Sequence, residues 1–341
     1  MAKEKLMSGM RPTGKLHLGH YIGVLSNWVK LQDDYQCYFS IADLHALTTK
    51  YDKTENLKTD ILNVVLDWLA SGIDPNKSNI YIQSLIPQVS QLHVLLSMIT
   101  PNNWVERDPT LKDMVKILKD KQECDNKDSS YCSISYGLLG YPVLMATDII
   151  GLNAKVVPVG IDQVAHIEIA RDIARRFNYL YKTDFFIEPV AKLTEIPLLL
   201  GIDGQKMGKS FNNDIKISDT EEDTTKKIMK CITDPNRARK TDPGNTDNCE
   251  VAFKYYKAFA DNDTLTEIKN ECTLGKIGCV DCKRRLACLM NNRFRPIREK
   301  RIDLEKNIDT VKDIINEGSK RTRKEAQNIL DQVNNIMGMY T

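Results

Sequence analysis

Two histidines and two lysines occur in settings where they could hold phosphate groups. His17 and His20 are one helical turn apart in the segment HLGH, and Lys206 and Lys209 are three residues apart in the segment KMGKS. Imidazole N–H groups and lysine ammoniums both donate to phosphate oxygens, and lysine brings a point charge on a long stem. These four side chains could therefore bind a nucleoside triphosphate and stabilise the charge that develops when its α-phosphorus is attacked.

The residues around His17 suit a phosphate-binding turn. Gly9 and Gly14 allow backbone angles that other residues avoid, and Pro12 restricts the turn. A helix that opens near His17 would aim free N–H groups at an anion, and Gly19 would let a nucleotide approach without a clash. An HxGH segment alone is equally consistent with a strand-to-helix turn that carries two surface histidines. Nucleotidyltransferases use the same element, so the KMGKS segment is needed to decide.

The elements that must position these motifs alternate between short apolar runs and helical patterns. Strand-like runs occupy residues 6–9, 37–41, 80–83 and 156–159. This alternation predicts a parallel sheet in an α/β fold, where ligands bind beyond the carboxyl ends of the strands. HLGH and the segment GIDQ at 160–163 both fall at such ends. After KMGKS, helical patterns at 220–231, 251–272, 286–302 and 310–337 predict a second, helical domain.

The charge balance excludes a protein that binds nucleic acid over its whole surface. Lys and Arg number 48 and Asp and Glu 46, so a surface for RNA must be a local patch. Residues 283–301 offer one, with eight basic residues against one acidic residue, although a charged helix is usually only a solvated face. The first ten residues resemble neither a secretory signal nor a transit peptide, and no apolar stretch is long enough to span a membrane. We therefore expect a cytoplasmic protein without membrane contact.

Five ordered blocks resemble the tryptophanyl-tRNA synthetases of class I and together extend over nearly the whole chain. They are MRPTGKLHLGHYIG, FSIADLHALT, YPVLMATDII, VPVGIDQVAHIEIARDIARRFN and KMGKS. The resemblance implies a Rossmann-like catalytic domain at 1–212, with a connecting and dimer-forming insert at about 86–140, and a helical anticodon-binding domain at 213–341. It also implies a homodimer that acts on tRNA(Trp).

The resemblance implies that tryptophan attacks Mg·ATP to give tryptophanyl-adenylate and pyrophosphate, and that the terminal ribose of the tRNA then takes the aminoacyl group. His17, His20, Lys206 and Lys209 would stabilise charge. The implied ATP-binding residues are Arg11, Pro12, Thr13, Gly19, His20, Lys112, Gly160, Ile161, Asp162, Lys206, Met207, Gly208, Lys209 and Ser210. The chain departs from the family at Gly208, where a serine is usual, which puts any role of that side chain in doubt.

A selective pocket for an indole needs apolar walls and one acceptor for its N–H group. Asp148, in the otherwise apolar segment YPVLMATDII, matches the tryptophan-reading aspartate of the family; as an isolated acid it would more often cap a helix or lie satisfied in the core. The implied tryptophan-binding residues are Asp148, Met145, Tyr141, Gln163 and His45. In the helix that follows GIDQ, an apolar stripe predicts core contacts and not a site; it consists of Ile167, Ala170, Ile173 and Phe177.

Other functions fit these blocks less well. A tyrosyl-tRNA synthetase shares the fold and is the nearest alternative. A nucleotidyltransferase would not need Asp148, GIDQ or the helical extension, and a catalytically silent RNA-binding paralogue would be expected to lose HLGH or the lysines.

Four cysteines follow the spacing C-x22-C-x6-C-x2-C at Cys249, Cys272, Cys279 and Cys282. Four thiolates predict a site for zinc or for an iron–sulfur cluster. A subset of bacterial tryptophanyl-tRNA synthetases has this spacing and holds a 4Fe-4S cluster near the anticodon-binding region, so the resemblance favours iron over zinc. The other cysteines have no such pattern and are interpreted as ordinary thiols: Cys37, Cys124, Cys132, Cys231 and Cys288.

Overall fold

A five-stranded sheet forms the centre of the structure, a computed structural model that describes residues 3–121, 134–193 and 199–340. All its strand pairs are parallel, and the order is β3-β2-β1-β4-β5. The strands are β1 (Lys5–Met10), β2 (Gln36–Ile41), β3 (Ser78–Ile82), β4 (Val156–Val159) and β5 (Val190–Leu193). The predicted parallel sheet and α/β fold are confirmed. The sequence did not indicate β5, because Val190 and Leu193 are exposed at the sheet edge and leave no buried apolar run.

Helices cover both faces of the sheet because successive strand residues point in opposite directions. Leu6 and Phe39 pack with Trp28 and Trp68 on one face, whereas Met7 lies on the other face. The helices of the first face include α1 (Leu18–His20), the π-helical turn η1 (Tyr21–Leu25), α2 (Ser26–Leu31) and α4 (Leu57–Ala70). On the second face lie α5 (Pro87–Ile99), α9 (Tyr141–Ile150) and α10 (Val164–Tyr181).

The remaining elements of this part of the chain lie in the connections between the strands or in the KMGKS segment. They are α3 (Asp43–Lys50), η2 (Gln83–Leu85), α6 (Asn102–Glu106), α7 (Pro109–Lys121), α8 (Tyr136–Leu139), η3 (Ile161–Gln163) and η4 (Lys209–Phe211).

After KMGKS the described chain is helical, as expected. Its elements are α11 (Glu221–Lys230), α12 (Ala252–Phe259), α13 (Asn262–Thr273), α14 (Cys279–Lys306) and α15 (Ile308–Ile336). The single helix predicted at 251–272 is wrong in one respect: it is two helices, because Asp261 accepts the backbone N–H of Thr264 and starts α13. No helix in the described parts of the chain is long and apolar enough to cross a membrane.

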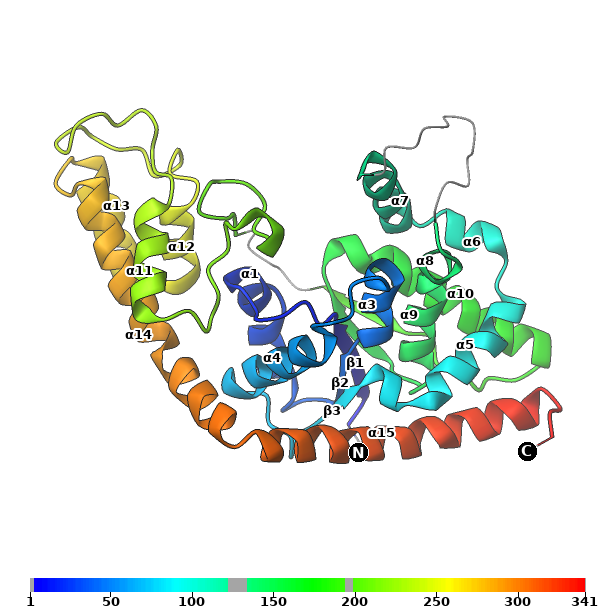
Figure 1. The fold of residues 1–341 in the computed structure, drawn as a ribbon. Coiled ribbons are helices and arrows are strands. Elements are labelled where there is room, and N and C mark those ends of the chain that lie inside the picture. Colours follow the sequence, from blue (N-terminus) through cyan, green and yellow to red (C-terminus); the bar gives the residue numbers. More distant parts are fainter. Residues whose placement is uncertain (1–2, 122–133, 194–198, 341) are drawn as a thin grey trace.

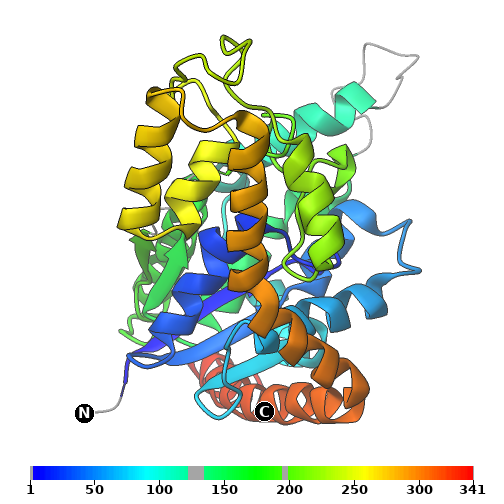
Figure 2. The same ribbon diagram turned by 90° about the vertical axis from the view of Figure 1, so that its left-hand side faces the viewer.

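Helix α15 returns to the sheet and packs along β3 and α5, at the bottom of the view in Figure 1. This contact needs a residue without a side chain, because a Cβ at Gly318 would collide with the carbonyl oxygen of Ile80. Helix α14 descends from the helical part to α15, as both Figure 1 and Figure 2 show. The chain end thus ties the helical part to the sheet.

Candidate active site

The HLGH and GIDQ segments meet at the topological switch point of the sheet. β1 is central, with β2 and β3 on one side and β4 and β5 on the other, which makes the gap beyond β1 and β4 the usual ligand site of such sheets. These two strands pair in register only at Leu6 and Val156, and Pro158 has no N–H to extend the ladder. A cavity of about 340 Å³ lies here, lined by both strands and by residues of α3, α7, α9 and α10.

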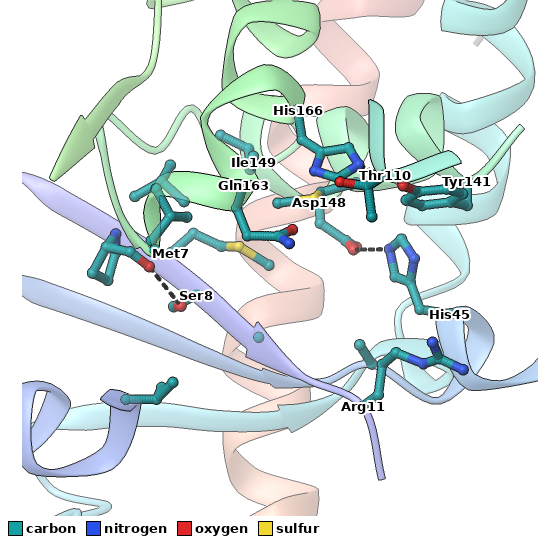
Figure 3. A pocket seen from close by; sticks show the side chains of 18 of the residues that line it. Met7, Ser8, Arg11, His45, Thr110, Tyr141, Asp148, Ile149, Gln163 and His166 are labelled. Atoms are coloured by element: carbon teal, nitrogen blue, oxygen red, sulfur yellow. Dashed lines mark hydrogen bonds and ion pairs between the residues drawn. The ribbon is translucent and has the colours of Figure 1, made fainter. Parts of the chain in front are cut away.

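Asp148 lines this cavity and has one carboxylate oxygen without a partner. Its Oδ2 accepts from Gln83 Nε2 at 2.7 Å and lies 3.1 Å from His45 Nε2 (Figure 3). Its Oδ1 is buried and has no hydrogen-bond partner among the described residues. A buried carboxylate oxygen without a donor is costly unless a ligand supplies one. Asp148 is therefore placed to accept a single N–H from a molecule in the cavity.

Tyr141 is held by two buried polar groups. Its hydroxyl donates to Asp108 Oδ2 at 2.9 Å and lies 2.6 Å from His166 Nε2, and His166 Nε2 lies 2.7 Å from the same Asp108 oxygen. Burial acts to raise the pKa of Asp108, but the hydrogen bonds from His166 and Tyr141 leave it below its ordinary value. Asp108 stays a carboxylate that fixes the Tyr141 hydroxyl at the cavity wall.

The other residues predicted to bind an amino acid also reach the cavity. Met145 and Gln163 line it, and Gln163 Nε2 donates to Asp162 Oδ2 at 2.8 Å. Apolar neighbours such as Ile149 and Val159 complete the walls. The cavity is thus an apolar space with a few polar atoms at fixed positions, as small-molecule sites usually are.

The two histidine rings of HLGH are in contact at the start of α1, with centroids 3.8 Å apart and planes tilted by 38°. His17 Nδ1 accepts the backbone N–H of Gly19 at 3.1 Å, and His20 Nδ1 accepts that of His17 at 3.4 Å. Burial lowers the pKa of His17 to about 4 and that of His20 to about 3, so both rings are neutral at pH 7. Because Nδ1 accepts in each ring, the proton is assigned to Nε2. Each histidine therefore offers one N–H to a phosphate oxygen.

The KMGKS segment packs directly against the HLGH segment. Lys209 Nζ donates to the carbonyl oxygen of Thr13 at 2.6 Å, and burial lowers its pKa to about 8, although Asp60 and Asp214 oppose that shift. Lys206 is exposed. The structure brings the lysine motif and the histidine motif together although Lys206 lies 186 positions after His20.

Gly208 does not require a glycine for its backbone. Its φ is −166°, which is extended and open to any residue. A Cβ there would approach the Phe211 ring at 3.1 Å, and Phe211 is largely exposed and can move. The family's serine would therefore fit at this position.

Three of the predicted ATP-binding positions lie away from these contacts. Ile161 and Asp162 are exposed and do not line the cavity. Lys112 does not line the cavity, although Thr110 and Met114 on the same helix do. Its assignment as a phosphate contact stays a prediction.

Sequence reasoning missed several polar residues that hold the site. Gln83 binds Asp148, and Asp108 with His166 binds Tyr141. Gln83 had a usable signal, since it directly follows a strand whose carboxyl end faces the crevice. Asp108 lies in a loop with no such signal, and His166 lies beside the apolar stripe of α10, where nothing in the sequence marks it as part of a site. The stripe at Ile167, Ala170, Ile173 and Phe177 is buried, so its assignment to the core is confirmed.

The four cysteines gather at the start of α14. Burial and the neighbouring thiols Cys249, Cys272 and Cys279 raise the pKa of Cys282 to about 12. Arg237 Nη1 lies 3.8 Å from Cys272 Sγ and 4.0 Å from Cys279 Sγ. Within the residues that the structure describes, no three metal-binding side chains converge closely enough to hold one metal ion. Of the cysteines interpreted as ordinary thiols, Cys124 and Cys132 lie outside the described residues.

The basic stretch at 283–301 is only partly available to RNA, which corrects the sequence-based interpretation. Arg298 and Arg301 are buried and bind protein groups. Lys283 Nζ donates to the carbonyl oxygen of Met229 at 2.8 Å. The exposed positions include Arg293 and Lys300. Hydrophobic spacing could not show which basic residues turn inward.

Comparison with known proteins agrees with this geometry. The profile of a family described as tRNA synthetases class I (W and Y) matches residues 2–295. The tryptophan–tRNA ligase of Thermotoga maritima is 44% identical over 98% of this chain and 99% of that protein. The tryptophan–tRNA ligase of Aquifex aeolicus is 40% identical over 98% of this chain and its own full length. The crystal structure of tryptophanyl-tRNA synthetase from Campylobacter jejuni, complexed with ADP and tryptophan, superposes with a TM-score of 0.87 at 34% identity, covering 98% of this chain and 100% of that one.

Proposed function

The chain belongs to the tryptophan–tRNA ligases of the class I synthetase family, and we propose that the cavity between β1 and β4 is where it activates tryptophan with ATP. The observation that carries this assignment is the unpaired Oδ1 of Asp148, a residue that lines a largely apolar cavity. The indole N–H is the one polar group of the tryptophan side chain, and Asp148 supplies one buried acceptor for it. The hydroxyl of a tyrosine side chain would lie at a different position from the indole N–H and would not meet this acceptor in the same way.

The amino-acid backbone would lie toward Tyr141 and Gln163. Both residues line the cavity with polar atoms, and Tyr141 is held in place by Asp108. Their oxygens can accept from the α-ammonium, while Met145 packs against the indole. His45 keeps Asp148 oriented through the hydrogen bond to Oδ2. The proposed roles of Asp148, Met145, Tyr141 and Gln163 are those expected from the sequence, whereas His45, expected to bind tryptophan, would act through Asp148.

Activation is an in-line displacement at the α-phosphorus of ATP, whose accompanying Mg²⁺ is bound as part of the substrate. A carboxylate oxygen of tryptophan forms the new P–O bond, and the bond to the bridging oxygen breaks to release pyrophosphate. His17 and His20 donate Nε2–H groups to phosphate oxygens, and Lys206 and Lys209 neutralise the developing charge. In transfer, the terminal ribose hydroxyl of the tRNA attacks the aminoacyl carbonyl and AMP leaves.

Lys209 must leave Thr13 to serve ATP. Its ammonium now donates to the Thr13 carbonyl, and its pKa is about 8 because of burial. A triphosphate beside it would raise that pKa and keep it protonated. The remaining ATP-binding assignments are unchanged from the sequence: Arg11, Pro12, Thr13, Gly19, Lys112, Gly160, Ile161, Asp162, Met207, Gly208 and Ser210.

Residues 1–212 would form the catalytic domain and residues 213–341 the anticodon-binding domain. The exposed basic residues of α14, such as Arg293 and Lys300, suit RNA phosphates. A cytoplasmic homodimer with the insert at about 86–140 in its interface completes the proposal, and its support is the likeness to the family.

The four cysteines would hold a 4Fe-4S cluster, with zinc as the alternative. The donor set fits: Cys249, Cys272 and Cys279 lie near Cys282, and Gly244 leaves room, because a Cβ there would lie 2.6 Å from Cys272 Sγ. Thiolates around a four-iron cluster bind four separate irons and need not converge on one point, whereas zinc requires sulfurs at about 2.3 Å from one ion. The positions of the four cysteine side chains therefore support a zinc site less well than a cluster site. A bound cluster would supply structural cross-links between the loop at Cys249, the end of α13 and the start of α14.

The experiment that tests the function is ATP–pyrophosphate exchange with each amino acid in turn. Exchange that depends on tryptophan supports the proposal. Exchange that depends on tyrosine would replace it with the tyrosyl alternative, and no exchange with any amino acid would favour a silent paralogue.

A further inference from the structure

Helix α14 is connected to the proposed ATP-binding segment on both sides of its histidines, directly at Tyr21 and through Asp67 at Leu16. After HLGH, the ring of Tyr21 meets the ring of Phe294 edge to face, with centroids 5.1 Å apart. Before HLGH, the backbone N–H of Leu16 donates to Asp67 Oδ2 at 2.7 Å, and the other oxygen of Asp67 accepts from Arg301 Nη1 at 2.5 Å. The same helix is therefore connected to the chain just before His17 and just after His20.

The contact at Arg301 is fully buried. The exposed fraction of the Arg301 side chain is 3% and that of Asp67 is 0%. Arg301 Nη1 and Nη2 also donate to the carbonyl oxygen and Oδ1 of Asn63, at 3.1 and 2.7 Å, one turn before Asp67 on α4. A buried guanidinium with a fixed fork of donors orients a carboxylate more strictly than an exposed ion pair does.

The Leu16 amide depends on this carboxylate. Burial raises the pKa of Asp67, and the Arg301 guanidinium beside it opposes that shift. Without Arg301, the Asp67 carboxylate would either bind a proton or move away from its present position. In both cases the Leu16 N–H would lose its buried charged partner. Leu16 lies directly before His17, and its carbonyl oxygen accepts the N–H of Ile217, just beyond the KMGKS loop. A shift at Leu16 would thus move both phosphate-binding motifs.

The opposite end of α14 lies in the helical part. Cys279 and Cys282 are in its first turn, and the hydroxyl of Tyr256 on α12 donates to the carbonyl oxygen of Cys282 at 2.8 Å. Pro296 lies inside the helix between Phe294 and Arg301, where it removes one backbone hydrogen bond. Figure 1 shows the helix curving as it passes from α13 toward α15.

We infer that Asp67 and Arg301 are positioning residues for ATP, through which α14 sets the HLGH segment relative to the helical domain. Neither side chain lines the tryptophan cavity. Disturbing the pair should therefore impair ATP binding and leave tryptophan binding nearly unchanged. The inference rests on the proposed function for the identity of the nucleotide.

The test compares Arg301→Gln and Arg301→Lys with Arg298→Gln in tryptophan-dependent ATP–pyrophosphate exchange by the full-length protein. Arg298 is a matched control because it is also buried, lies one turn earlier on α14, and binds Asn291 and Thr224 within the helical part. We expect Arg301→Gln to raise the KM for ATP about tenfold or more, since small misplacements of a binding segment are costly, with the KM for tryptophan within about twofold. Arg298→Gln should leave the KM for ATP unchanged.

Amide hydrogen exchange gives a second readout that does not need catalysis. The Leu16 N–H should exchange faster in both Arg301 variants than in the parent or in Arg298→Gln. If Arg301→Gln does not fold, Arg301→Lys carries the test, because it keeps the charge and loses the paired donors. Equal KM values for ATP in folded Arg301 and Arg298 variants, or parallel rises for ATP and tryptophan, would overturn the inference. A parent protein without exchange activity would refute the proposed function alone, since Leu16 exchange would still report on the pair.

Discussion

Replacing Asp148 with asparagine tests the amino-acid pocket with almost no change of shape. Asp148 Oδ2 accepts from Gln83 and His45, and Oδ1 is the free acceptor. Asparagine has one oxygen and one NH₂ group. If its oxygen keeps Gln83 and His45, the NH₂ group faces the indole N–H; if it turns, the NH₂ group faces those two donors instead. At least one donor is left unpaired in either orientation.

An unpaired buried donor costs about 1–3 kcal/mol, which corresponds to about a 5- to 150-fold loss in kcat/KM for tryptophan. Tyrosine and phenylalanine lack the indole N–H, so their residual exchange should fall less. The preference for tryptophan over these two amino acids should therefore shrink in Asp148→Asn. Alanine at this position should have an effect of the same direction, with an added cavity.

The assay is ATP–pyrophosphate exchange with tryptophan, tyrosine and phenylalanine, using Asp43→Asn as control. Asp43 is also a buried carboxylate; it accepts from Ser84 N at 2.9 Å and does not line the cavity. The control separates loss of a buried charge from loss of the indole acceptor. Unchanged tryptophan preference in a folded Asp148→Asn protein would refute the pocket assignment.

Three further predictions concern the motifs and the cysteines. Lys209→Ala should slow adenylate formation in single-turnover measurements by about 10²–10³-fold with little change in tryptophan affinity, because its charge acts mainly in the transition state; an unchanged rate would exclude Lys209 from activation. The free energy of unfolding of the parent should fall as the pH drops from about 6.5 toward about 4 and 3. The reason is that the pKa values of His17 and His20 in the folded protein lie below their ordinary value, so the unfolded chain binds those protons first. In thermal melting, the stability of His20→Asn should depend less steeply on pH in this range, and equal slopes for the two proteins would contradict the assignment of neutral histidines. Anaerobically purified protein should contain close to four irons per chain, as four cysteinates around a 4Fe-4S cluster require. Cys282→Ser should then impair tRNA charging or unfolding stability while tryptophan-dependent exchange persists; one zinc per chain would keep the site and replace the cluster, and metal-free protein would remove both.

Local sequence patterns were sufficient to predict the strands and helices whose formation depends mainly on residues close together in the chain. Short apolar runs such as that of β4 predict buried parallel strands, and HLGH and GIDQ were expected beyond the carboxyl ends of such strands. The resemblance then supplied roles for Asp148 and its neighbours. The structure places these residues around one cavity.

Boundaries and edges were less predictable from sequence. β5 is exposed at the sheet edge, so its apolar residues do not form a buried run. The break between α12 and α13 depends on the cap at Asp261, which a mostly continuous helical pattern conceals.

The chain itself determined which chemical groups are present and in what order, because strand, helix and turn preferences act over a few residues. Only the tertiary structure decided that Gln83 holds Asp148, that Asp108 and His166 hold Tyr141, and that two arginines of a basic stretch turn inward. Arg301 and Asp67 are 234 positions apart, and nothing near either residue signals the other. Their pairing arises when α14 packs against α4, and burial then makes a partner for each charge obligatory.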